Sequence, residues 1–177
     1  ANPIGSLWHL KKYPTIIGFV VAFFFIYLAG QSVQSTWSFF TMYRFNWEAK
    51  TVGYSLTLVG LVVALVQAVL VNWVVKRFGQ FKTVVIGMSL WCTGLFLFAF
   101  ATQSWMMFAF IIPYCLGGIA GPTLQGIISN EVPNTQQGEL QGSLTSIMSL
   151  TNIIGPVLMT FIFYAFTGDN APFELPG

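Results

Sequence analysis

The stretch TIIGFVVAFFFIYLAGQSVQSTWSFFT, residues 15–41, decides the fold of this protein. It contains no Asp, Glu, Lys, Arg or His and is mostly apolar. A helix needs about 20 such residues to cross a hydrocarbon layer about 30 Å thick. The run is too long for a secretory signal peptide, and no small-residue cleavage site ends it early. Residues 15–41 therefore predict a membrane-spanning helix.

Four further apolar stretches predict spans over residues 51–75, 83–102, 105–129 and 141–166. Of the 177 residues, 55% are hydrophobic and 7% are charged, whereas a soluble domain carries roughly 25% charged residues. The net charge of +2 is too small to bind a phosphate backbone, so nucleic acid is excluded as a partner. A soluble domain and a disordered chain are excluded as well. The expected fold is all-α and transmembrane, with five spans in a lipid bilayer.

The charged residues lie outside these five spans and predict the orientation. The side with the N-terminus and the second and fourth connections carries Lys11, Lys12, Lys76, Arg77 and Lys82, and the other side carries Arg44 and Lys50. Basic residues favour the cytoplasm, so the N-terminus is expected to be cytoplasmic and the C-terminus outside.

The spans contain no Asp, Glu, His, Lys or Arg that could act as an acid, base or ligand. Proton relays usually show as charged or histidine residues at membrane depth. Cys92 and Cys115 have no metal-binding spacing. We therefore expect no catalytic residue, no metal, no cofactor and no enzymatic activity. If the protein couples to protons, the titrating groups lie on another segment.

Neutral polar residues recur at helical spacing on two spans and predict a face turned away from lipid. The third span has almost none and is expected to be the lipid-facing helix. Glutamine and asparagine are costly to bury, so they either contact a ligand or bridge helices. The candidate substrate-binding residues are Gln31, Gln34, Gln67, Gln125 and Asn152, together with Trp37, which follows the polar stripe of the first span.

Glycine and proline cluster in the fourth and fifth spans. Gly117 and Gly121 form a small-xxx-small pair that lets another helix approach closely. Pro122 can kink its helix, and Gly155 and Pro156 repeat the theme. Such helices suit bundles that rock against each other, and simple tight packing is the alternative.

Two motifs resemble a known family. Residues 72–82 resemble the cytoplasmic loop signature of the major facilitator superfamily, with matches at Arg77, Gly79 and Lys82 and departures at Asn72 and Lys76. Residues 137–144 and 149–156 are similar to the eleventh helix of tetracycline-resistance-type efflux proteins, a branch of the drug:proton antiporters. Further similarity lies at Asn2-Pro3, Arg44–Trp47, Val52-Gly53, Gly117-Gly118, Pro122 and Leu124-Gln125, so it extends along nearly the whole chain.

The resemblance implies that the five spans are helices seven to eleven of a twelve-helix transporter. Residues 1–177 would then be a C-terminal half without its last helix, with the N-terminal six-helix half as partner. A proton gradient would drive efflux of a small molecule across a bacterial inner membrane. Helices seven, eight, ten and eleven would line the central cavity, with helix nine outside. Arg77, Gly79 and Lys82 would form a gating loop.

The resemblance also bears on the substrate. Tetracycline pumps of this branch tend to carry a histidine and an aspartate at the positions that match Val63 and Trp91. Both residues are apolar here, so an apolar drug or lipid-like compound is expected rather than tetracycline. Two alternatives are an importer of a sugar or metabolite with the same fold, and a non-transporting subunit that packs on a partner through Gly117, Gly121 and residues 138–142.

Overall fold

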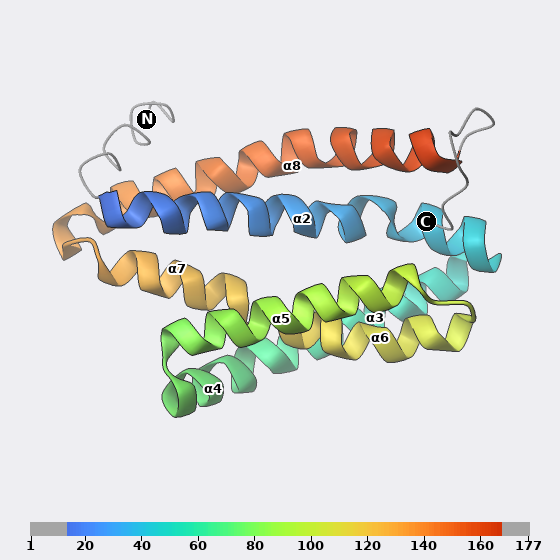
Figure 1. Ribbon diagram of the computed structural model, residues 1–177, viewed down its shortest axis with the longest axis horizontal. Coiled ribbons are helices and arrows are strands. Elements are labelled where there is room, and N and C mark those ends of the chain that lie inside the picture. Colours follow the sequence, from blue (N-terminus) through green and yellow to red (C-terminus); the bar gives the residue numbers. More distant parts are fainter. Residues whose placement is uncertain (1–13, 168–177) are drawn as a thin grey trace.

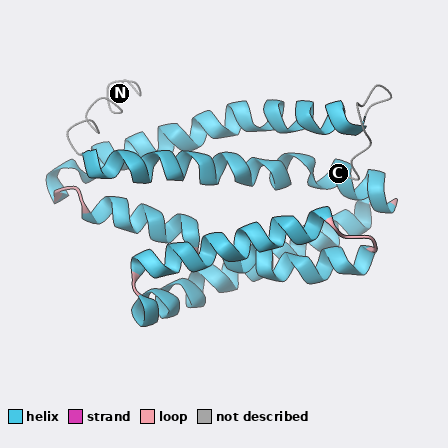
Figure 2. Cartoon of the chain, viewed as in Figure 1, coloured by secondary structure: helices cyan, strands magenta, loops and turns pink. Residues whose placement is uncertain are grey.

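A computed structural model describes residues 14–167 of the chain, and every regular element in this part is helical (Figure 2). The expectations that fall on Asn2-Pro3, on Lys11 and Lys12 and on the residues after Thr167 lie outside the described residues. The elements are α2 (Pro14–Phe45), α3 (Ala49–Leu65), the π-helix η2 (Val66–Leu70), α4 (Val71–Phe78), α5 (Gln80–Ala99), α6 (Ser104–Gly117), α7 (Ala120–Asn130), the 3-10 helix η3 (Asn134–Gln136) and α8 (Gln137–Thr167).

The five predicted spans are confirmed as five helical segments long and apolar enough to cross a membrane. The second span is built from α3, η2 and α4, and the fourth from α6 and α7. Their bounds are Ile16–Phe45, Ala49–Phe78, Gln80–Ala99, Ser104–Asn130 and Asn134–Thr167.

Most helices extend beyond the predicted ends and include charged residues. Arg44 lies in the last turn of α2, Arg77 in the last turn of α4, and Glu139 in the first turn of α8. The end turns of the helices thus include charges that lie outside the predicted spans. Helical hydrogen bonding continues past the hydrocarbon layer, where long charged side chains reach the headgroups. The third span ends earlier than predicted, at Ala99, because residues 100–103 turn the chain into α6.

Figure 1 shows α2 and α8 running side by side, with α5, α6, α3 and α4 forming a second group. Helix α7 contacts both α2 and α5 and joins the two groups. The start of α2, the α4–α5 turn and the α7–α8 connection lie at the same end of the bundle. This is the zigzag that five consecutive spans produce.

Glycines bring α5 into close contact with α6 and α7. A Cβ atom on Gly117 would lie 2.6 Å from the Cβ of Trp91, and one on Gly94 would lie 2.7 Å from the Cα of Tyr114. Gly87 makes the same kind of approach to Ala120, at 2.9 Å from its backbone nitrogen. One face of α5 is thus buried in the bundle, so the third span, predicted to be the lipid-facing helix, can turn only its other faces to lipid. These contacts are made at glycines, which are not polar, so the pattern of polar residues along the span could not predict them.

The fourth span breaks at its glycines and not at Pro122. The chain leaves the helix around Gly118, and Pro122 is the third residue of the new helix α7. A proline in a first turn removes no intrahelical hydrogen bond. Gly121 does not share the close approach of Gly117, since the nearest atom to its Cβ position is the Tyr27 hydroxyl at 3.6 Å. Helix α8 continues unbroken through Pro156.

Candidate functional site

A cavity of about 630 Å³ lies between α2, α8, η2 and the α5–α7 group. Its volume is within the range of about 300–1,000 Å³ that small-molecule sites have. The cavity brings together residues as far apart in the chain as Ile26 and Asn152. All five amide residues singled out in the sequence line it, namely Gln31, Gln34, Gln67, Gln125 and Asn152, as do Gly117, Gly121 and Pro122.

A short hydrogen bond joins the two long helices at the cavity wall. The Nε2 of Gln31 donates to the Oδ1 of Asn152 at 2.6 Å, and Gln31 is buried. Gly155 lies directly behind Gln31, because a Cβ on Gly155 would overlap the Cγ of Gln31 and lie 2.6 Å from its Cβ. The α2–α8 contact therefore fixes the orientation of one amide in the cavity.

A second amide pair joins α7 to α8 at the end nearer the α4–α5 turn. Gln125 Nε2 donates to Gln141 Oε1 at 2.8 Å. Close by, Gln137 Nε2 donates to the carbonyls of Ser129 and Val132, at 2.6 and 2.8 Å. These bonds satisfy carbonyl groups at the end of α7 that the helix itself leaves open. Gln125 thus bridges two helices while it lines the cavity.

The other two amides have a different setting. Gln34 and Gln67 are exposed and make no side-chain hydrogen bond within the described part of the chain. Gln67 belongs to the π-helical turn η2. Short π-helical turns are rare and frequently occur at functional sites. These two amides are available to a ligand without breaking a bond between helices.

The sequence analysis missed several cavity residues as binding candidates, and the large side chains among them include Tyr27, Trp91, Tyr114 and Met148. The centroids of the Trp91 and Tyr114 rings lie 6.0 Å apart. Among residues 14–167, Trp91 is the tryptophan placed farthest from the ends of its predicted span. That position was the available signal, since tryptophans usually sit at the membrane interfaces. Val63 does not line the cavity and packs against the aromatic cluster described below.

Trp37 lies outside this cavity, so its grouping with the amides is corrected. Its side chain is 5% exposed and packs edge-on against Phe98, with ring centroids 5.2 Å apart. Its Nε1 donates to the Oγ of Ser55 at 2.9 Å. The indole thereby links α2 to α3 in an aromatic cluster with Trp47. The position of Trp37 is set by its contacts with α3 and α5, which the polar stripe along its own helix cannot reveal.

Replacing Trp37 with phenylalanine is expected to lower stability without changing substrate affinity. The variant loses the hydrogen bond to Ser55, worth about 1 kcal/mol, and keeps an aromatic ring against Phe98. Thermal unfolding in detergent and equilibrium binding on the same preparation measure the two effects. Trp105→Phe is the control, because Trp105 is 64% exposed and bonds only its neighbour Gln103. A weakened affinity in Trp37→Phe would contradict the structural role.

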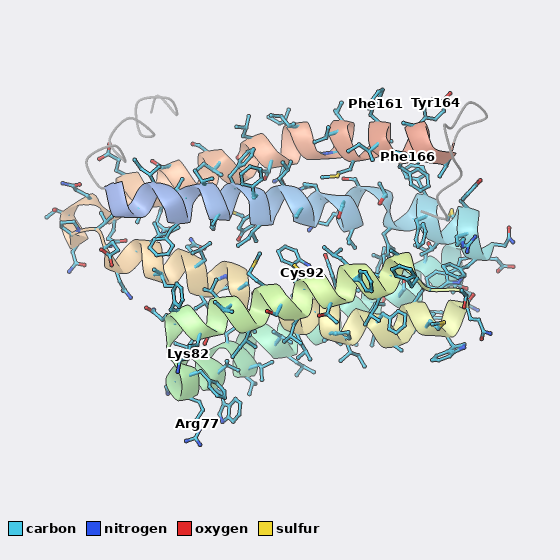
Figure 3. The ribbon with its side chains drawn as sticks, viewed as in Figure 1. Arg77, Lys82, Cys92, Phe161, Tyr164 and Phe166 are labelled. Carbon is cyan, nitrogen blue, oxygen red and sulfur yellow. The ribbon has the colours of Figure 1, made fainter. Side chains whose placement is uncertain are left out.

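The three gating-loop candidates lie at the α4–α5 turn. Gly79 has φ of 80° and ψ of 162°, a conformation that is essentially restricted to glycine. This residue lets α5 begin directly after α4, and its carbonyl accepts from Thr83 Oγ1 at 2.7 Å. Arg77 and Lys82 are exposed, and Figure 3 shows Arg77 pointing away from the bundle. The turn thus presents two cations at one end of the molecule.

Five helices long and apolar enough to cross a bilayer make this chain an integral membrane protein. The family model described as Major Facilitator Superfamily matches residues 17–173, so the chain belongs to this family.

Among its relatives is a tetracycline resistance protein, class C, from Escherichia coli, 38% identical over 164 residues that cover 93% of this chain and 41% of the relative. The class E protein from the same organism is 42% identical over 148 residues, or 84% of this chain and 36% of that protein. A hippocampus abundant transcript-like protein 1 from Bos taurus is 28% identical over 94% of this chain and 33% of its own length. The chain thus spans about two fifths or less of the length of these relatives.

Proposed function

We propose that this chain is helices seven to eleven of a proton-coupled efflux transporter, that is, its C-terminal half, and that it has no enzymatic activity. The observation that carries the proposal is the cavity that gathers five neutral amides from α2, η2, α7 and α8. Membership of the superfamily and the similarity to tetracycline resistance proteins support it. A proton gradient is the driving force, and no cofactor takes part.

The cavity residues orient the substrate by neutral hydrogen bonds. Gln34 and Gln67 offer open amides, and Gln31 and Asn152 present a pair joined by a hydrogen bond. In alternating access, two halves rock about a central site, so the N-terminal half supplies the facing wall and the proton-titrating groups. The substrate then leaves when the bundle opens to the other side.

The orientation proposed for the chain is N-terminus in the cytoplasm, in a bacterial inner membrane. Within residues 14–167, Lys76, Arg77 and Lys82 lie at the end of the bundle with the α4–α5 turn, and Arg44 and Lys50 lie at the other end. Basic residues favour the cytoplasmic side. The bacterial resistance proteins among the relatives support the choice of membrane.

An apolar aromatic drug is the proposed substrate class, in preference to tetracycline. The wall of the cavity carries the rings of Tyr27, Trp91 and Tyr114 and no charged side chain among the described residues. Aromatic rings offer stacking surfaces to flat apolar molecules. Trp91 occupies the position where tetracycline pumps tend to carry an acidic group that could hold the drug's bound cation.

Transport by the full-length protein in proteoliposomes tests this proposal. With an acid interior, an apolar aromatic dye is expected to accumulate inside, and accumulation should collapse when a protonophore removes the gradient. Movement of tetracycline alone would refute the substrate class. Movement that ignores the gradient would refute proton coupling. Accumulation of a sugar when the gradient is reversed, with the acid side outside, would favour a proton-coupled importer. Absence of any flux would favour a non-transporting subunit.

Replacing Arg77 with alanine is expected to slow transport about tenfold while KM changes less than about twofold. The guanidinium lies outside the cavity and would act on helix ends at the cytoplasmic gate, where positive charge interacts with helix C-termini. Initial rates over a range of dye concentrations separate the two parameters. Lys50→Ala, an exposed cation at the opposite end of the bundle, is the control. Equal losses in rate and affinity would count against a gating role.

A further inference from the structure

A second pocket, of about 500 Å³, lies beside the polar cavity between α2, α5 and α7. Its lining side chains are aliphatic, aromatic or sulfur-containing, with Phe19, Phe25, Phe81, Met88 and Cys92 among them. Figure 3 shows Cys92 on the side of α5 that faces α2. The pocket is of drug-like size and offers a ligand almost no hydrogen-bonding partner.

The two pockets share a wall. On α2, Ala22 and Ala29 face the apolar pocket, whereas Gly30 and Gln31 face the polar cavity. Ile26 lines both. These residues follow two neighbouring stripes of one helix, as the spacing of 3.6 residues per turn requires.

Trp91 completes this wall from the other side. It is the second residue that lines both pockets, and it comes from α5. The rim of its indole reaches α2, where a Cβ on Gly30 would lie 3.5 Å from the ring, an ordinary contact. The backbone of Trp91 is seated on Gly117 of α6. One indole ring and one isoleucine therefore separate the two spaces.

Within the described part of the chain, the mouth of the apolar pocket is aromatic and exposed. Phe25 and Phe81 both line the pocket and are 59% and 68% exposed. Large apolar side chains exposed on membrane-spanning helices meet lipid tails or other apolar groups. Phe81 is the second residue of α5, so the pocket begins in the half of the bundle that carries the α4–α5 turn. In the proposed orientation this is the cytoplasmic leaflet.

We propose that the apolar pocket is a lateral entry site for a lipophilic aromatic molecule dissolved in the bilayer, and that Trp91 is the gate between this site and the polar cavity. The route to the cavity rests on the proposed efflux function, whereas binding in the pocket does not. An apolar ring gains contact with Phe25 and Phe81 on entry and loses no hydrogen bond. Rotation of the Trp91 side chain then joins the two spaces.

Photolabelling of the full-length protein in lipid nanodiscs tests the site with a membrane-soluble aryl diazirine as probe. In the wild type, labels are expected on Met88 and Cys92, at least fivefold above Phe96, and only weakly on Met148 on the cavity side, because the closed gate admits few molecules. Phe96 is 65% exposed on α5 and lines neither pocket. An excess of an unlabelled aromatic compound should remove the Met88 and Cys92 labels and leave the Phe96 label unchanged.

Trp91→Ala is expected to increase the labelling of Met148, and Trp91→Phe, which keeps a ring in the wall, to increase it less. Ile26→Ala shortens the other side chain of the same wall. It provides the same test if Trp91→Ala fails to fold. Phe96→Ala is the control variant and should keep the wild-type pattern. Labelling of Met148 that stays at the wild-type level in Trp91→Ala and Ile26→Ala would overturn the gate.

The experiment can refute the proposed entry site and the proposed efflux function independently of each other. Labels on Met88 and Cys92 that an aromatic competitor does not displace would mean that lipid tails or another protein segment fill the pocket, and would overturn the entry site. Displaceable labels in a protein that moves no dye would refute the proposed function and leave the binding site in place. Displaceable labels together with dye transport support both.

Discussion

The Gly117→Ala variant is expected to lose about 2–3 kcal/mol of its free energy of unfolding, the upper range for an overpacked contact. The added methyl group would lie 2.6 Å from the Cβ of Trp91 and 2.7 Å from its backbone atoms. Because backbone cannot rotate aside, α5 and α6 must separate. The measurement is thermal or denaturant unfolding of the purified protein in detergent.

A matched control distinguishes this contact from a general effect of alanine. Gly18 lies in α2, and no atom of the described residues lies within 4 Å of its Cβ position. Gly18→Ala is expected to be neutral or slightly stabilising, because alanine favours a helix over glycine by about 1 kcal/mol. Gly94→Ala adds a methyl group to the same α5–α6 interface from the other helix. The double variant should therefore lose less free energy of unfolding than the sum of the two single losses. A wild-type midpoint in Gly117→Ala would disprove the close packing.

The Gly155→Ala variant is expected to lower transport at least about tenfold at low substrate concentration, which corresponds to about 1.4 kcal/mol. The new methyl group would overlap the Cγ of Gln31 and displace its amide from Asn152. Both the fixed amide pair and the α2–α8 approach would then be lost. Dye accumulation in proteoliposomes, corrected for the amount of folded protein, measures the effect.

The double variant Gly155→Ala/Gln31→Ala separates packing from recognition. Shortening Gln31 removes the overlap at its Cγ and leaves the 2.6 Å contact at its Cβ, so stability should return only part of the way to that of the wild type. Transport should stay low, because the cavity still lacks the Gln31 amide. Recovery of transport along with stability would show that Gln31 acts only in packing. Gly155→Ala with wild-type transport would refute the positioning role of Gly155 itself.

Much of the site could be read from spacing along single helices. Gln31 and Gln34 lie on one face of α2 because they are three residues apart, and Asn152 lies on the polar stripe of α8. A buried amide in a membrane must find a partner or a cavity. The structure brings these three residues to one space with Gln67 and Gln125.

Spacing along one helix could not place the aromatic residues. Trp37 and Trp91 are both apolar enough for lipid, for protein packing or for a cavity wall. Trp37 packs against Phe98 and bonds Ser55, and Trp91 reaches Gly30. Contacts with helices distant in sequence decide between these settings.

The sequence by itself determined the five spans and the polar faces of the first and last of them. The physical reason is local: a bilayer requires about 20 apolar residues per helix and leaves no backbone group unpaired. Only the tertiary structure decided that Gly94 and Gly117 bury one face of α5, that the fourth span breaks near Gly118, and that Trp91 separates two pockets. These features depend on the distance between helices, which side chains from several segments set together.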